Sequence, residues 1–401
     1  MSSALHFLHP SAIFPSSLLP SIQEKKIGNF EAGFTKPRLN FKNPRFFPSI
    51  RAATNPPSSF YTGVRTELDV VQSHSEIVPD TVIFDDFERF PPTAATVSSS
   101  LILGICSLPG NQFRRDVDTA LADAKCSLIE ESNKRTDCFL DKALVNVGAS
   151  LAKLVPGRVS TEVNIRHAYD TSGIVNKVYY LLKLYHELGL SPERLLFRIP
   201  ATWQGIEASK MLESKGIQTH LTFVNSFCQA AAAAQAGTSV IQIYTGRIRD
   251  WSRCNKNDPE IEAARSMGQD PGRALVSKVY NYIHKFGYKT KMMVSAIRNE
   301  QDLFDVLGVD YIVTPVRILQ SLKMSMAPLE HKYYLTRKLH PENAASCRFT
   351  IDELVKWDES NFAAAVGPGA TALLIAGIEG YHDQTDRVEE LLKKMWPPPN
   401  V

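Results

Sequence analysis

The segment RLLFRIPATWQGIEASKMLESKGIQTHLTFV, residues 194–224, decides the fold. It has short apolar runs at 194–199 and 219–224, of a length and composition that suit strands buried on both faces. Residues 202–216 between them are typical of a helix. The segment therefore predicts a strand–helix–strand unit, and it places a permanent cation, Arg198, in the middle of a buried strand.

The same alternation continues along the chain after Tyr61. We predict strands over 81–85, 93–98, 158–164, 194–199, 219–224, 239–246, 289–296 and 310–316, and helices over 175–189, 202–216, 226–237 and 273–287. About eight strands in about 240 residues favour a single (β/α)8 TIM barrel (an α/β fold) with extra helices and a C-terminal helical tail. A two-domain doubly wound arrangement is the alternative.

The first fifty residues differ in composition from the rest. Up to Arg51 they hold seven Lys and Arg, two Glu and no Asp, a net charge of +5, so with +3 for the whole chain the remainder is about −2. Such a Ser-rich, basic leader is typical of a transit peptide. We predict a chloroplast (plastid stroma) transit peptide over 1–53, a linker over 54–79 and the barrel over 80–401.

Composition also limits the partners. The near-neutral body gives no electrostatic case for nucleic acid, and no apolar run of about 18 residues suggests a membrane span. The six cysteines are scattered without a C-x-x-C pair and suggest free thiols, and the histidines are equally dispersed. We expect no metal and no cofactor, and leave a homodimer open.

Polar residues gather where the predicted strands end, which is where barrel enzymes place their sites. Arginines suit bidentate phosphate contacts, while hydroxyls and amides suit a polyol. The candidates are Asp85 or Asp86, Ser98 to Ser100, Glu162, Asn164, Arg198, His220, Thr222, Gln242, Tyr244, Arg247, Ser295 and Arg298.

At these residues the chain resembles the transaldolase family of the class I aldolase superfamily. The segments that carry the resemblance are PGRVSTEV (156–163), TWQGI (202–206), GRIRDW (246–251), KVYNYIHKFGYKT (278–290) and IRN (297–299). The resemblance implies transfer of a dihydroxyacetone unit between sugar phosphates of the pentose phosphate pathway, through a Schiff base on a lysine of the fourth strand.

Carried over by residue, the resemblance implies phosphate binding by Arg247 and Arg298. It implies that Glu162 and Thr222 hold a catalytic water, and that Asp85 is the acid or base of the first strand. Tyr244 stands where the small fructose-6-phosphate aldolase relatives also have a tyrosine.

The departures concern the substrate-binding asparagines, a serine and the lysine. Ser98 and His220 replace two asparagines, Gln242 replaces a serine, and Arg198 in RIPATW replaces the Schiff-base lysine. A guanidinium stays protonated and is a poor nucleophile, so it cannot form the covalent intermediate. A buried Arg198 would instead need a carboxylate partner, and Asp85 or Glu162 could supply it.

We therefore expect a sugar-phosphate-binding homologue that has lost or altered the activity. The alternatives are an active transaldolase, a lysine-independent aldolase of the fructose-6-phosphate type, and an interaction scaffold.

Overall fold

The computed structural model describes residues 65–81, 83–108, 110–327 and 335–397 of the 401-residue chain. The chain divides into one unit of residues 1–61 and a second of residues 62–401, and the description below concerns the second. The predicted transit peptide, and the predicted linker up to residue 64, lie outside the described residues.

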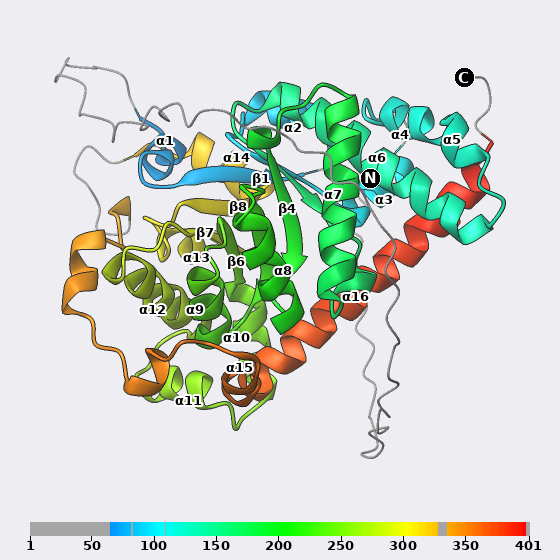
Figure 1. Ribbon diagram of the computed structural model, residues 1–401. Coiled ribbons are helices and arrows are strands. Elements are labelled where there is room, and N and C mark those ends of the chain that lie inside the picture. The colour runs from blue at the N-terminus through cyan, green and yellow to red at the C-terminus, as the bar shows by residue number, and fades with distance from the viewer. Residues whose placement is uncertain (1–64, 82, 109, 328–334, 398–401) are drawn as a thin grey trace, which may run out of the picture. The chain divides into compact units, whose positions relative to one another are not determined.

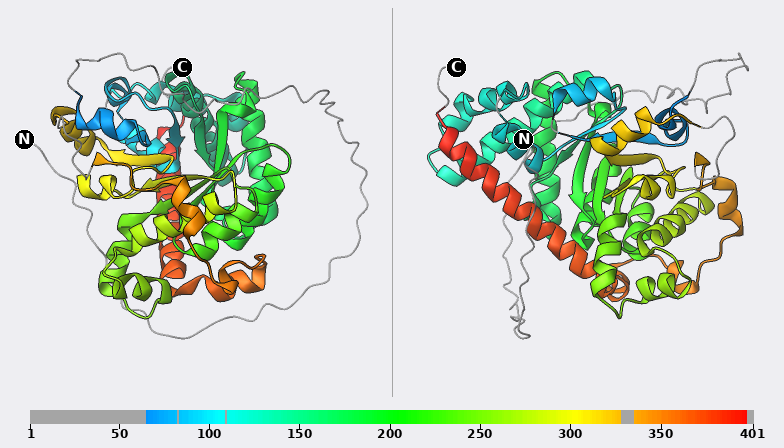
Figure 2. Two further views of the ribbon diagram at one scale, coloured as in Figure 1. Left: turned by 90° about the vertical axis from the view of Figure 1, so that its left-hand side faces the viewer. Right: turned by 180° about the vertical axis from the view of Figure 1, so that it is seen from behind.

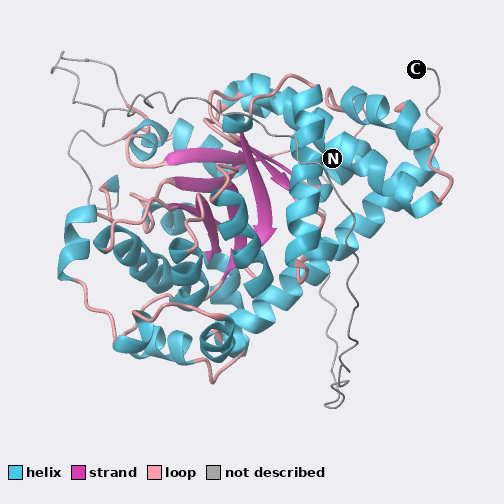
Figure 3. Ribbon diagram, viewed as in Figure 1, coloured by secondary structure: helices cyan, strands magenta, loops and turns pink. Residues whose placement is uncertain are grey.

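Eight parallel strands form a nearly closed barrel with helices around it (Figures 1 and 3). The strand order in the sheet is β1-β8-β7-β6-β5-β4-β3-β2, so β1 and β2 are the two edges and are not paired with each other. The bounds are β1 Glu76–Asp80, β2 Ala95–Val97, β3 Val159–Glu162, β4 Leu195–Pro200, β5 Thr219–Val224, β6 Val240–Tyr244, β7 Lys291–Ser295 and β8 Tyr311–Pro315. The predicted TIM barrel is confirmed.

The first strand lies earlier than the sequence predicts. The strand predicted over 81–85 is wrong: β1 pairs with β8 from Glu76 to Asp80, and a helix begins at Phe84. The apolar run around Ile83 misleads because that residue is half exposed at the start of the helix. The barrel therefore begins before residue 80, within the range expected to be a linker.

The helices follow the strands as the alternation predicts. Their bounds are α1 Glu67–Gln72, α2 Phe84–Arg89, α3 Ser99–Ser107, α4 Arg114–Leu121, α5 Ala124–Ser127, α6 Ser132–Leu154, α7 Thr171–Glu187, α8 Trp203–Glu213, α9 Phe227–Gln235, α10 Thr245–Cys254, α11 Pro259–Ser266, α12 Pro271–Lys285, α13 Glu300–Phe304, α14 Val316–Met324, α15 Glu359–Ala365 and α16 Gly367–Met395. Short 3-10 turns lie at η1 Ile165–His167, η2 Pro192–Arg194, η4 Pro341–Ser346 and η5 Ile351–Glu353.

Two helices illustrate why these segments fold as they do. In α7 the residues Ile174, Val178 and Leu181 recur at helical spacing on one face and are buried in the same hydrophobic cluster as strand residues of β4. In α9 a run of five alanines is buried, because small side chains let the helix lie close to the barrel, and Ser226 caps its first turn in a capping box.

The C-terminal helix α16 covers the ends of several strands. It contacts β5, η1 and α3, and Figures 1 and 2 show it as the long red helix that runs from α15 to the region of α6. No single described helix is long and apolar enough to cross a membrane, and the bent pair α15 and α16, at 100°, passes that test by length and composition only. The predicted helical tail is thus part of the barrel's C-terminal face.

One prediction about the cysteines is wrong. Cys126 in α5 and Cys138 in α6 form a disulfide across 12 residues of sequence, whereas the scattered spacing suggested free thiols throughout. The two residues lie on consecutive helices joined by a short loop, which brings them together although no C-x-x-C motif marks them.

Candidate active site

The strand register places three polar residues side by side inside the barrel. Glu162 of β3 is the partner of Arg198 of β4, which in turn is the partner of His220 of β5. Residues in register on parallel strands face the same side of the sheet, so these side chains share one layer of the interior. Their exposed fractions are 3%, 6% and 0%, and charges this deeply buried need partners.

Arg198 finds its partner in Glu162. Its Nη2 donates to Glu162 Oε2 at 2.8 Å, and Ser99 Oγ donates to the other carboxylate oxygen at 2.7 Å. Thr385 of α16 donates in turn to Ser99 Oγ at 3.3 Å. We call Ser99, Glu162, Arg198 and Thr385 the inner network. Both oxygens of Glu162 therefore already accept hydrogen bonds from the protein.

An aromatic ring covers the Arg198 guanidinium. The guanidinium carbon lies 5.2 Å from the ring centroid of Tyr381 in α16, within the range of a cation–π contact. Burial opposes the charge, but the interactions with Tyr381 and Glu162 outweigh it, so the pKa of Arg198 is raised. The group is a permanent cation, and the sequence-based argument that it cannot act as a nucleophile applies to it in this environment.

A second set of hydrogen bonds joins β5 and β6. The two hydroxyls, Thr222 Oγ1 and that of Tyr244, lie 2.8 Å apart, and they lie 3.3 and 3.2 Å from Gln242 Oε1. With one hydrogen each, the hydroxyls make two of these three contacts as hydrogen bonds. The structure thus brings Thr222, Gln242 and Tyr244 together as predicted candidates. It does not join them to Glu162 by any hydrogen bond between the described residues, so the expected pair of Glu162 and Thr222 belongs to two separate networks.

The ring of Phe223 lies between these networks and α16. This residue has a left-handed φ of 61° at a register irregularity in β5, and its ring stacks on Tyr244 and meets Tyr381 edge-on. A Cβ at Gly377 of α16 would lie 2.7 Å from the Phe223 ring, so only glycine lets the helix approach this closely. The contact fixes where Tyr381 sits over Arg198.

His220 is buried without a charge. Its Nδ1 lies 2.8 Å from Ser160 Oγ, and burial together with the nearby Arg198 cation lowers the pKa of His220 to about 3. The imidazole is therefore neutral at physiological pH. It occupies the place where the resemblance implies a substrate-binding asparagine, and it can offer one donor and one acceptor.

Two predicted phosphate ligands lie where β6 and β7 end. Arg247 is exposed with its guanidinium 4.9 Å from the ring centroid of Tyr244, and Arg298 donates to Asp250 at 2.8 Å. Gly246 allows this arrangement, because a Cβ there would lie 2.3 Å from the carbonyl oxygen of Ala296. We call Arg247, Asp250 and Arg298 the rim. Unlike Arg198, these arginines are accessible to a ligand.

The structure does not bring Asp85 to the other candidates. Asp85 is an exposed residue in the first turn of α2, and no hydrogen bond or ion pair between described residues links it to Glu162 or Arg198. The acid at the end of β1 is Asp80, five residues earlier. Asp80 is exposed as a whole residue, yet loss of water around its carboxyl raises its pKa.

A small pocket opens at the unpaired edges of β1 and β2. It has a volume of about 110 Å³ and is lined by Asp80, Thr96, Ser98 and Ser100 among others. Ser98, a predicted candidate, also caps α3 by accepting from the backbone of Leu101 at 3.3 Å. This part of the barrel mouth is therefore polar, and the acid that lines it is Asp80 and not Asp85.

Sequence reasoning named Ser99 among the candidates but missed three other residues of this site. Asp80 carried a usable signal, because it lies at a strand end once β1 is placed correctly. Tyr381 and Thr385 carried none, since they lie on the last helix and not on a strand. Among the described residues, no group of three or more His, Cys, Asp and Glu side chains is arranged to hold a metal ion.

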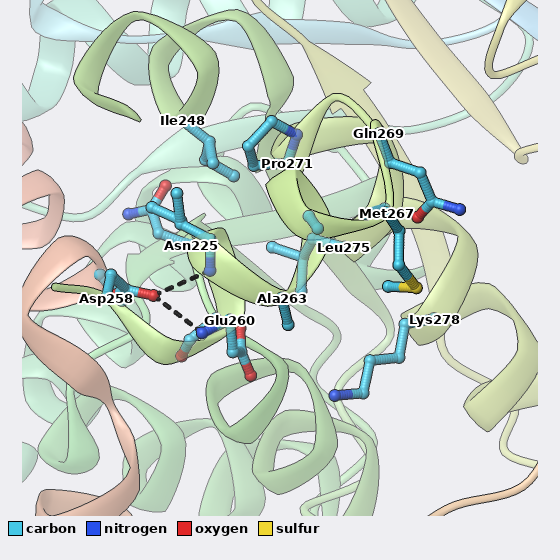
Figure 4. A pocket seen from close by; sticks show the side chains of 15 residues that line it. Asn225, Ile248, Asp258, Glu260, Ala263, Met267, Gln269, Pro271, Leu275 and Lys278 are labelled. Carbon is cyan, nitrogen blue, oxygen red and sulfur yellow. Dashed lines mark hydrogen bonds between the residues drawn. The ribbon is translucent and has the colours of Figure 1, made fainter. Parts of the chain in front are cut away.

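A larger pocket lies apart from these residues, between α10, α11 and α12 (Figure 4). Its volume is about 220 Å³, and Ile248, Met267 and Leu275 line it together with Glu260 and Lys278. Asp258 beside it accepts from the backbone of Glu260 and Ile261, each at 3.1 Å, and so caps α11. None of the predicted site residues lines this pocket.

The barrel, with polar side chains at the C-terminal ends of its strands, has the architecture of a TIM-barrel enzyme. The model of the transaldolase/fructose-6-phosphate aldolase family matches residues 77–391. The transaldolase of Histophilus somni strain 129Pt is 35% identical over 82% of this chain and 98% of its own. That of Haemophilus influenzae strain KW20 is 34% identical over the same shares, and that of Actinobacillus succinogenes is 37% identical over 67% and 82%. The chain belongs to the transaldolase/fructose-6-phosphate aldolase family.

Proposed function

We propose that this protein binds phosphorylated sugars in its barrel mouth and no longer forms the Schiff base of its family. The observation that carries the proposal is the buried ion pair between Arg198 and Glu162. It places a non-nucleophilic cation where the resemblance implies a lysine, and it also occupies the carboxylate that would hold the catalytic water. The guanidinium and the carboxylate are therefore already paired with each other.

No other lysine offers a replacement within the strands. Among the eight described strands the single lysine is Lys291, the first residue of β7, at the end of the barrel away from the mouth. It is paired with Asp310 at 2.7 Å. A carbonyl bound near Ser98 or Tyr244 therefore has no amine of a strand residue beside it.

The rim supports binding of a phosphate. Arg247 has no salt bridge to another described residue, and Arg298 keeps about half of its side chain exposed beside Asp250. Guanidinium groups at the open end of a barrel suit a phosphate, and the small polar pocket by Ser98 suits the hydroxyls of a sugar. The transaldolases to which the chain is similar act on this class of compound, as the family's name indicates.

Two measurements test the proposal. Borohydride added to the full chain with fructose 6-phosphate should trap no covalent adduct, while calorimetry should detect binding of the same compound. The double variant Arg247→Ala/Arg298→Ala should weaken that binding about 100-fold, because it removes two charge-assisted contacts. A trapped adduct on the unaltered protein would mean an active transaldolase, the alternative favoured by its relatives, and absence of binding would refute the proposal.

The variant Arg198→Lys is the matched test of the lost chemistry. We expect weak turnover at best, because Ser98, His220 and Gln242 also differ from what the resemblance implies for an active site. Turnover near that of a bacterial transaldolase would show that these three substitutions are harmless.

We also propose that residues 1–53 direct the chain to the plastid. The support is the basic, Ser-rich composition of this leader and the sequence SIRAATN (49–55) at its end. A fusion of residues 1–60 to a fluorescent protein should enter plastids, and a fusion lacking residues 1–53 should not.

A further inference from the structure

Two buried nitrogen atoms of the barrel interior have no hydrogen-bond partner. They are Arg198 Nε and His220 Nε2, and both are shielded from solvent. The two residues are register partners on β4 and β5, so the unpaired atoms belong to neighbouring positions of one layer. A buried polar atom without a partner costs about 1–3 kcal/mol, which makes this pair a candidate for contact with a ligand.

Both atoms can donate a hydrogen bond. The Nε of an arginine always carries a hydrogen, and a neutral imidazole carries one on one of its two nitrogens. When Ser160 Oγ donates to His220 Nδ1, at 2.8 Å, the ring hydrogen lies on Nε2. Gln242 raises the pKa of His220, but no hydrogen bond of ordinary geometry joins the two side chains, and Gln242 Oε1 lies within hydrogen-bonding distance of the Thr222 and Tyr244 hydroxyls. In this tautomer the interior presents two N–H donors without a partner, and among the described residues of the strands the hydroxyl of Ser295 on β7 is unpaired as well.

The charges around the donors select the kind of oxygen that they can bind. Glu162 already balances Arg198, so a carboxylate placed here would bring a second negative charge next to Glu162. A hydroxyl would bring its own hydrogen, while the oxygens of Glu162 and Gln242 already accept hydrogen bonds from the protein. A carbonyl oxygen has neither disadvantage, because it is neutral and only accepts.

We infer that Arg198 Nε and His220 Nε2 together bind the carbonyl oxygen of an open-chain sugar phosphate, without forming a covalent bond to it. The inference rests on the proposed function, since the rim arginines hold the phosphate at the other end of the ligand. It makes His220 and Arg198 the residues that distinguish a sugar phosphate with a carbonyl from a sugar alcohol phosphate or a sugar acid phosphate. Sites built around a donor discriminate strongly against ligands that leave it unpaired.

Calorimetry on the full chain with four ligands tests this inference. The ligands are fructose 6-phosphate, glucitol 6-phosphate, in which a hydroxyl replaces the carbonyl oxygen, 6-phosphogluconate, which carries a carboxylate, and inorganic phosphate. We expect the open-chain form of fructose 6-phosphate to bind about tenfold more tightly than glucitol 6-phosphate or 6-phosphogluconate, as the gain of one to two hydrogen bonds predicts. The measured affinity is corrected for the fraction of fructose 6-phosphate that is open-chain in solution.

Variants connect this preference to His220. In His220→Leu the affinity for fructose 6-phosphate should fall about tenfold while that for glucitol 6-phosphate stays the same. His220→Gln, which keeps an N–H donor, should restore part of the preference, and His186→Leu on the outer face of α7 is the control. Thermal unfolding of each variant shows that it is folded, and the ¹⁵N chemical shifts of the His220 ring report which nitrogen carries the hydrogen.

The outcomes separate the two proposals. Equal affinity for glucitol 6-phosphate and for the open-chain form of fructose 6-phosphate, or an unchanged preference in folded His220→Leu, would overturn the carbonyl contact and leave the proposed function intact. Water would then occupy the two donors. Tighter binding of 6-phosphogluconate would overturn it in favour of a carboxylate. Absence of binding for all four ligands would refute the proposed function and this inference with it.

Discussion

The inner network and the rim each contain an arginine paired with a carboxylate, but the inner pair is buried and the rim pair is exposed to solvent. In the inner network the side chains of Arg198 and Glu162 are 6% and 3% exposed, and each is bound to the other at 2.8 Å. At the rim the side chains of Arg298 and Asp250 are 52% and 46% exposed, with a contact of the same length. Equal distances therefore accompany very different surroundings.

The difference shows which arginines can serve a ligand. In the interior, water cannot replace a lost partner, so Arg198 and Glu162 depend on each other and hold the mouth together. At the rim, water screens the ion pair, and Arg298 can exchange Asp250 for a phosphate at small cost. Under the proposed function the rim binds the phosphate, whereas the ion pair of the inner network stabilises the fold. The unpaired nitrogens of Arg198 and His220 are the buried groups proposed to contact a ligand.

The largest expected effect follows from removing the inner carboxylate. Glu162→Ala leaves a buried guanidinium without its counter-ion and Ser99 without its acceptor, so the free energy of unfolding should fall by about 3–5 kcal/mol. Urea unfolding monitored by circular dichroism measures the change. The double variant Glu162→Ala/Arg198→Met should recover most of the loss, because it removes the unpaired charge as well.

A loss below about 1 kcal/mol in Glu162→Ala would contradict this account. It would mean that water reaches Arg198 and that the inner network is as well solvated as the rim. The comparison between the two regions would then have no energetic basis.

The second effect concerns pH. The pKa of His220 is about 3 in the folded protein and about 6.5 in the unfolded chain, so below pH 6.5 the unfolded state binds a proton that the folded state does not. The stabilisation of the folded state by neutral His220 is fully present above pH 6.5 and is lost as the pH falls toward 3. At pH 5 it should lower the stability by about 2 kcal/mol relative to pH 7.

The measurement compares the unaltered protein with His220→Leu between pH 7 and pH 5. The loss of stability should be about 2 kcal/mol smaller in the variant, since every other titrating group is shared. Parallel curves would show that His220 titrates near its ordinary pKa, and hence that the interior is wet.

The sequence predicts the barrel well because buried parallel strands are nearly continuous apolar runs. Seven of the eight strands lie within one or two residues of their expected positions. The exception is β1, whose short apolar centre is hard to recognise because the strand contains Pro79 and has charged residues, Glu76 and Asp80, at its ends. That one shift moved the expected acid from Asp80 to Asp85. An error of a few residues in the position of a strand has little effect on the predicted fold, but it changes which residue is assigned to the site.

The pairings inside the site were only partly predictable. A buried arginine requires a carboxylate, and of the two candidates the register selects Glu162. Nothing in the sequence shows that Tyr381, 183 residues later, covers the same guanidinium, because that contact depends on where α16 crosses the strand ends. Contacts along neighbouring strands follow from the alternation of elements, whereas contacts from a terminal helix depend on how it packs.

The smallest effect isolates the rim. Asp250→Asn removes the partner of Arg298 at an exposed site, so the free energy of unfolding should change by less than about 1 kcal/mol. The same substitution removes a negative charge near the proposed phosphate site and leaves Arg298 without its counter-ion, so inorganic phosphate should bind about two- to fivefold more tightly. Calorimetry at low and high ionic strength measures this gain, which should shrink as salt screens the exposed charges. A weaker affinity in Asp250→Asn would mean that Asp250 orients Arg298 toward the ligand, and the rim would then be preorganised in the same way as the inner network.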